Sequence, residues 1–192
     1  GDLGFWTNWH DGSHRYEDWV LRELMPLVAR RYHTLPCPEG CHLFGISMGG
    51  AGSLRIALRH PERFATVASI SGPVFDTDRM MAFATDFWVN LFIPVERVWG
   101  PLSDVGRVAR EDPFLRWTSP AAMGPFRLLL AWGDAEDVSL AASNVHFSGH
   151  LGEHGIPHAA IVFSGGHNWT SWRPVFLQTL RFQVWGSPAP RH

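Results

Sequence analysis

Hydrophobic residues follow two patterns along this chain. Between residues 16 and 33 they recur at helical spacing with charged residues between them, which predicts an amphipathic helix. Elsewhere they form short, mostly apolar runs bounded by Gly and Pro, as is typical of buried strands. Four such runs predict strands at 42–46, 64–70, 126–132 and 159–163.

Helical segments separate most of these predicted strands. They span about 48–60, 139–153 and 171–185. Alternating strands and helices predict an α/β fold with a parallel sheet flanked by helices. Residues 74–125 interrupt the alternation with scattered prolines, aromatic residues and charges, so we interpret them as a partly helical insertion. We expect one domain over residues 1–192.

Composition limits the partners of this domain. The chain is 45% hydrophobic and has a formal net charge of -2, with no run of basic residues. This balance gives no electrostatic footprint for nucleic acid or an anionic membrane, and no apolar stretch is long enough to span a bilayer. We therefore expect a soluble protein that binds neither.

The two cysteines, Cys37 and Cys41, flank a short Pro/Gly turn. Two cysteines are too few for a disulfide framework or a zinc site of their own. We expect two ordinary thiols, with a local disulfide as the alternative. The compartment stays open on this basis, with the cytoplasm favoured over secretion.

The segment Gly45-Ile46-Ser47-Met48-Gly49 stands between a predicted strand and a predicted helix. In this context the pattern G-x-S-x-G is typical of a nucleophile elbow, in which a sharp, strained turn exposes the serine above the sheet. Composition alone would produce the pattern by accident in roughly one chain of this length in ten. The interpretation of Ser47 as a nucleophile therefore depends on its partners elsewhere in the chain.

A serine hydroxyl needs a histidine to take its proton and a carboxylate to orient that histidine. His167 follows the strand that ends near residue 163, in a glycine-containing loop. Acidic residues follow the strand that ends at Trp132, so the order along the chain is serine, acid, histidine. Because parallel strands end at one edge of a sheet, we expect all three side chains to meet there.

The acid is harder to choose, because three carboxylates follow Gly133 within a few residues. We predict Asp137. Asp134 and Glu136 remain alternatives, since Asp134 could serve to cap the turn and Asp137 could equally be the N-cap of the next helix.

A stripe of histidines, His146, His150 and His154, recurs at helical spacing and raises the question of a metal. No carboxylate signature accompanies the stripe, and polar residues at this spacing are typical of a solvated helix face. We expect neither a metal nor a cofactor.

With these motifs in place, the chain resembles the esterase branch of the α/β-hydrolases that includes esterase D, S-formylglutathione hydrolase, feruloyl and acetylxylan esterases, and the mycolyltransferases. The similarity runs nearly end to end. It rests on 16–27 before the elbow, on 45–50 at the elbow, on 60–72 after it, and on 155–158 and 165–172 around the histidine. The resemblance implies a Ser-His-acid esterase.

Two departures from the family pattern matter. The family usually places the acid three residues after the glycine, whereas Asp137 is four after Gly133, which keeps the alternatives open. The family also has strands and a loop with an oxyanion donor upstream of the position where this chain begins. We therefore expect N-terminal strands to be missing and the backbone N–H of Met48 to supply one of the two oxyanion donors.

The predicted function is hydrolysis of a carboxylic ester through an acyl-enzyme intermediate, with a short acyl or carbohydrate-linked ester as the small-molecule substrate. The alternatives are acyl transfer to another acceptor and a binding domain that keeps the fold without catalysis. Aromatic residues are candidates for the substrate pocket. They are Trp9, Trp169 and Trp172, with Phe87 and Trp88 of the insertion.

Overall fold

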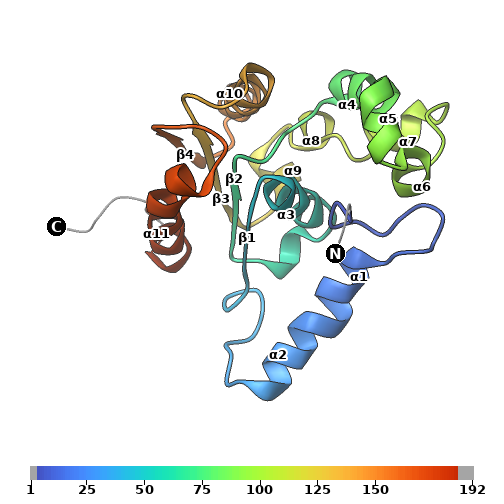
Figure 1. The fold of residues 1–192 in the computed structure, drawn as a ribbon. Coiled ribbons are helices and arrows are strands. Elements are labelled where there is room, and N and C mark those ends of the chain that lie inside the picture. The colour runs from blue at the N-terminus through green and yellow to red at the C-terminus, as the bar shows by residue number, and fades with distance from the viewer. Residues whose placement is uncertain (1–3, 186–192) are drawn as a thin grey trace.

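A computed structural model describes residues 4–185 and forms one parallel sheet (Figure 1). Its strands pair in the order β1-β2-β3-β4. They span His42–Ile46 (β1), Thr66–Ile70 (β2), Arg127–Gly133 (β3) and His158–Phe163 (β4). The four predicted strands are thus confirmed, and their carboxyl ends share one edge because every pairing is parallel.

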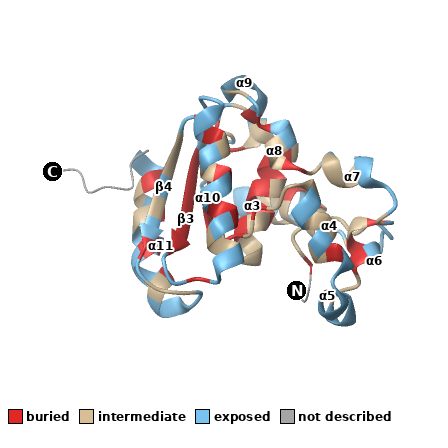
Figure 2. Ribbon diagram, turned by 90° about the horizontal axis from the view of Figure 1, so that it is seen from above, coloured by how far each residue is buried: buried red, intermediate tan, exposed pale blue. Residues whose placement is uncertain are grey.

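Three long helices cover the two faces of the sheet. Helices α3 (Met48–Arg59) and α10 (Val138–Glu153) pack on one face, and α11 (Trp169–Trp185) packs on the other. Seen from above, the buried strand β3 lies between α11 and α10 (Figure 2). All five residues of β2 are buried as well, which explains why the central strands are continuous apolar runs.

The segment between β2 and β3, which contains residues 74–125, is a set of short helices. Five of them begin at an Asp or Ser side chain that accepts a backbone N–H of the first turn: Asp76, Asp86, Asp104, Asp112 and Ser119. Each of these side chains caps the N-terminus of its own short helix. The helices are α4 (Thr77–Thr85), α5 (Phe87–Phe92), α6 (Val95–Trp99), α7 (Val105–Ala109), α8 (Pro113–Arg116) and α9 (Pro120–Met123). A single turn of 3-10 helix, η2 (Pro61–Arg63), precedes β2.

The predicted helix over 16–33 is continuous but is not α-helical throughout. It comprises α1 (Tyr16–Asp18), a π-helical stretch η1 (Trp19–Leu24) and α2 (Met25–Arg31). The buried carboxylate of Glu17 bonds Arg59 and His60 at the end of α3. This contact fixes the N-terminal helix against the elbow helix.

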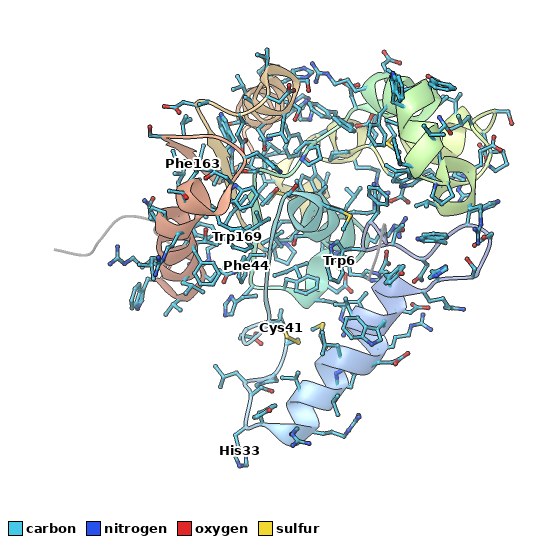
Figure 3. The ribbon with its side chains drawn as sticks, viewed as in Figure 1. Trp6, His33, Cys41, Phe44, Phe163 and Trp169 are labelled. Carbon is cyan, nitrogen blue, oxygen red and sulfur yellow. A yellow bond between two sulfur atoms is a disulfide. The ribbon has the colours of Figure 1, made fainter. Side chains whose placement is uncertain are left out.

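The prediction of two free thiols is wrong, because Cys37 and Cys41 form a disulfide. The bridge lies directly before β1, where Cys41 is labelled in Figure 3. The Pro/Gly turn brings the two Cα atoms to 5.0 Å, within the range that a disulfide needs.

Candidate active site

Ser47 lies between β1 and α3 in a strained backbone conformation, with φ 56° and ψ -123°. A side chain at Gly45 would place its Cβ 2.1 Å from the carbonyl oxygen of Gly49, so the first glycine of the motif is required for the turn. The second is not required in the same way, since a Cβ at Gly49 would meet nothing closer than 3.8 Å. The sharp turn exposes the serine hydroxyl at the carboxyl edge of the sheet.

The hydroxyl of Ser47 lies 2.7 Å from Nε2 of His167, which is 120 residues away in sequence. The loop that carries this histidine runs between Phe163 and Trp169, both labelled in Figure 3. The structure therefore brings together the two side chains that sequence spacing predicted at this edge.

Contacts with the end of β3 hold the histidine loop in place. The carboxylate of Asp134 accepts the N–H of Gly165 at 2.9 Å, and the N–H of Ala135 donates to the carbonyl of Gly165 at 3.1 Å. A Cβ at Gly133 would lie 2.1 Å from that same carbonyl oxygen. Asp134 thus positions the loop but does not contact the histidine ring.

The carboxylate beside the imidazole is Glu136, whose Oε1 lies 3.3 Å from Nδ1 of His167. Its side chain is fully buried, and Oε2 has no hydrogen-bond partner among the described residues. Because a carboxylate only accepts hydrogen bonds, Nδ1 carries the proton and Nε2 is left to accept from Ser47. This is the tautomer that general-base chemistry needs.

The structure does not bring Asp137, the predicted acid, to the histidine ring. Asp137 is the N-cap of α10, and its carboxylate accepts the N–H of Ser139 at 2.9 Å. Hydrogen bonds from the hydroxyl and the backbone N–H of Ser139 lower the pKa of Asp137. Within the described residues, the hydrogen bonds of the Asp137 carboxylate are those of the cap, and none joins it to the histidine ring.

Trp172 packs against the ring of His167. Its ring meets the imidazole of His167 edge-on, with 4.8 Å between ring centroids. Its indole N–H donates to Ser71 Oγ at 2.8 Å, and only 7% of the residue is exposed. Trp172 is therefore a structural neighbour of the site and does not line a substrate pocket.

Met48 is the first residue of α3, and its backbone N–H has no acceptor within the helix. The start of a helix also carries partial positive charge. An oxyanion formed at Ser47 would therefore meet a free donor and a favourable dipole at this point.

A cavity of about 560 Å³ opens at Ser47 between α3 and the insertion. Its walls are largely apolar, and arginine side chains from α3 and from the region of α7 and α8 also reach it. Its apolar lining includes Phe5, Phe75, Met80, Phe83, Val98 and Trp99.

The aromatic residues predicted for the pocket do not line this cavity. Trp9 packs against His14, with Arg97 over its ring. Trp169 is 70% exposed at the start of α11, and Phe87 and Trp88 are exposed on α5. Sequence reasoning did not identify the residues of α3 that line the cavity. The pattern that could have found them is the four-residue spacing at which Ala51, Arg55 and Arg59 follow Ser47.

The histidine stripe on α10 has protein partners. His146 contacts Arg79, and His150 bonds the carbonyl oxygen of Trp117. Across residues 4–185, no three His, Cys, Asp or Glu side chains gather closely enough to hold a metal ion. Within the same residues, no helix is both long and apolar enough to cross a bilayer.

These features define the α/β-hydrolase class. They are a parallel sheet, a serine at an elbow, a carboxylate after the third strand β3 and a histidine after the last strand β4. The family model described as "Putative esterase" matches residues 7–183, and the chain belongs to this family.

Two curated relatives come from Mycobacterium tuberculosis. One is an esterase, 28% identical over 177 residues that cover 81% of this chain and 37% of the relative. The other is the MPT51/MPB51 antigen, 26% identical over 194 residues that cover 91% and 62%. The chain thus spans between about a third and two thirds of the curated relatives it matches.

Solved structures support the fold. Fluorophosphonate-binding serine hydrolase F of Staphylococcus aureus aligns with a TM-score of 0.77 and 24% identity, over 94% of this chain and 68% of that one. An S-formylglutathione hydrolase of the same organism aligns with a TM-score of 0.68 and 23% identity, over 89% and 64%.

Proposed function

We propose that this protein is a serine carboxylic-ester hydrolase in which Ser47, His167 and Glu136 act as the triad. The observation that carries the proposal is the continuous chain of contacts from Ser47 Oγ through the imidazole to the buried carboxylate of Glu136. Membership of the esterase family supports the same reaction.

In the first half of the reaction, Ser47 Oγ attacks the ester carbonyl while Nε2 of His167 takes its proton. The negative charge that develops on the carbonyl oxygen is stabilised by the N–H of Met48. Glu136 stabilises the imidazolium, which then protonates the leaving alcohol. The products of this half are the free alcohol and an acyl group on Ser47.

In the second half, His167 takes a proton from water, and the resulting hydroxide equivalent attacks the acyl carbon. Collapse of that intermediate returns the proton to Ser47 and releases the carboxylic acid. The His167 side chain is 37% exposed, so water can reach it. Product analysis in the presence of competing alcohols separates hydrolysis from acyl transfer.

Replacing the nucleophile tests the proposal. Ser47→Ala should abolish p-nitrophenyl acetate hydrolysis and labelling by a fluorophosphonate probe, while the circular dichroism spectrum stays unchanged. The complete natural protein should be used, with any flanking sequence its gene encodes. Retained hydrolysis in the variant, or a wild-type protein that neither turns over esters nor takes the label, would overturn the assignment.

A further inference from the structure

The cavity at Ser47 extends along one face of α3. Ala51, Arg55 and Arg59 line it in turn after Ser47, at the four-residue spacing of a helix face. At 1.5 Å of rise per residue, the Cα of Arg55 lies about 12 Å from that of Ser47. Arg55 and Ser47 line the same cavity, so a ligand in it can meet both.

The three acidic residues that line this cavity already have protein partners. Asp76 caps α4 and pairs with Arg79 at 3.4 Å, and Asp112 accepts both the N–H and the hydroxyl of Thr77 at 2.7 Å. Glu111 forms an ion pair with Arg59 at 2.9 Å. Each of these carboxylates is thus held by another partner, and within residues 4–185 none of them forms an ion pair with Arg55.

Among the described residues, Arg55 is the arginine of α3 that forms no ion pair, although the charges of Glu111 and Glu17 act on it through space. Within residues 4–185 it forms no ion pair, and its only hydrogen bond is a long one, 3.4 Å, to the carbonyl oxygen of Phe5. Trp99 lies beneath it, with the guanidinium carbon 6.0 Å from the ring centroid. Desolvation by these walls lowers the pKa of Arg55, although an arginine stays charged at neutral pH.

A partly buried guanidinium with four N–H groups to spare is costly unless an anion pairs with it. Further positive charge adds to its field. Arg107, Arg110 and Arg116 also line the cavity and form no ion pair with the described residues. The cavity therefore combines apolar walls with an excess of positive charge near one unpaired arginine.

We propose that Arg55 binds an anionic group of the substrate, so that the preferred substrates are esters carrying a carboxylate away from the scissile bond. This inference rests on the proposed function. The charge fixes the chemistry of the group but not which side of the ester bears it, so the test includes both an acyl and an alcohol arm.

The first test uses matched esters and the wild-type protein. In the acyl arm, mono-p-nitrophenyl adipate is compared with the p-nitrophenyl ester of its primary half-amide, which has the same shape without the charge. In the alcohol arm, the acetate ester of 3-hydroxyphenylacetic acid is compared with the ester of the corresponding amide. We expect kcat/KM to favour the carboxylate at least about tenfold in one arm, with the preference falling as salt rises. A preference for the amide, or none, in both arms overturns the proposal.

The second test assigns the preference to Arg55. Arg55→Met keeps much of the side-chain length without the charge and should reduce the carboxylate-to-amide ratio of kcat/KM at least about tenfold, chiefly through KM. Arg55→Lys should retain part of the ratio. The matched control is Arg31→Met on the exposed end of α2, which loses the same charge away from the cavity and should keep the wild-type ratio. An unchanged ratio in Arg55→Met refutes the role.

A binding measurement separates this inference from the proposed function. In a Ser47→Ala background, which cannot turn over substrate, calorimetry is run on the ester pairs of both arms, and the carboxylate ester of at least one arm should bind more tightly than its matched amide. The added change Arg55→Met should remove that difference. If no ester is hydrolysed but this difference is present, the reaction is wrong and the anion site stands. If esters are hydrolysed and the difference is absent, the anion site is wrong and the reaction stands.

Discussion

Glu136→Gln is the change that tests how the histidine is oriented. The substitution keeps the shape of the side chain but allows an amide N–H₂ group to face Nδ1 of His167 in place of a carboxylate oxygen. Nδ1 would then become the acceptor and Nε2 would carry the proton. An imidazole in that tautomer cannot take a proton from Ser47, although Oγ still lies 2.7 Å away.

The size of the effect follows from the contact that is lost. Amide replacement of a triad carboxylate lowers kcat by about 10⁴ in serine proteases. Here the distance between Nδ1 and Oε1 is 3.3 Å, longer than the roughly 2.7 to 2.9 Å of a strong charge-assisted hydrogen bond. We therefore expect a loss of about 10³ in kcat for p-nitrophenyl acetate, or about 4 kcal/mol of transition-state stabilisation, with KM nearly unchanged.

Glu136→Gln should not lower the stability of the protein. The side chain of Glu136 is fully buried, and Oε2 has no partner in the described part of the chain, so its charge is poorly compensated. Removing that charge should leave the thermal unfolding midpoint unchanged or raise it. A large loss of kcat without a loss of stability would separate a catalytic role from a structural one.

Asp137→Asn is the matched control, because it removes a neighbouring carboxylate while asparagine remains a good N-cap for α10. Steady-state assays should give a kcat within about twofold of wild type. The reasoning is refuted if Asp137→Asn is the more damaging change, or if Glu136→Gln retains more than about a fifth of wild-type kcat.

Two further predictions concern the fold around the site. Gly45→Ala should unfold the elbow and abolish activity, because its Cβ would lie 2.1 Å from the carbonyl oxygen of Gly49. Gly49→Ala should fold and keep measurable activity, because its Cβ would meet nothing closer than 3.8 Å. Circular dichroism and ester assays compare the two variants, and equal damage from both would contradict the geometry. Removing the Cys37–Cys41 disulfide with a double serine variant should cost about 2 kcal/mol in urea unfolding, given the short loop it closes. Alkylation followed by mass measurement should label both cysteines only after reduction, and labelling without reductant would contradict the bridge.

Much of the fold was predictable from local signals. The buried strands correspond to continuous apolar runs in the sequence, and the long helices correspond to apolar residues at helical spacing. Both patterns arise because these residues are buried. The insertion was harder to resolve into elements. Its helices depend on single capping side chains such as Asp76, Asp86 and Asp104, and a lone aspartate in a sequence is an ambiguous signal.

The acid shows where sequence reasoning reaches its limit. Asp134, Glu136 and Asp137 all follow the same strand end, and each does something different: Asp134 holds the histidine loop, Glu136 contacts the imidazole, and Asp137 caps a helix. Chemistry alone does not distinguish them, since the choice depends on which side chain turns inward. In the resembling family the acid usually stands three residues after the glycine, a position that Glu136 occupies in this chain.

Helix α3 links the chemistry to the choice of substrate. Ser47 precedes its first turn, the N–H of Met48 begins it, and Arg55 lies two turns further along the same face. A rigid helix fixes the separation between the reacting carbonyl and the guanidinium, so an anionic substrate must match that length as well as carry the charge. For a carboxylate on the acyl side, kcat/KM of the mono-p-nitrophenyl esters, after subtraction of spontaneous hydrolysis, should therefore pass through a maximum as the acid is lengthened from succinate through adipate to suberate. The neutral half-amides should show no such maximum, because nothing else in the apolar wall fixes the position of their far end.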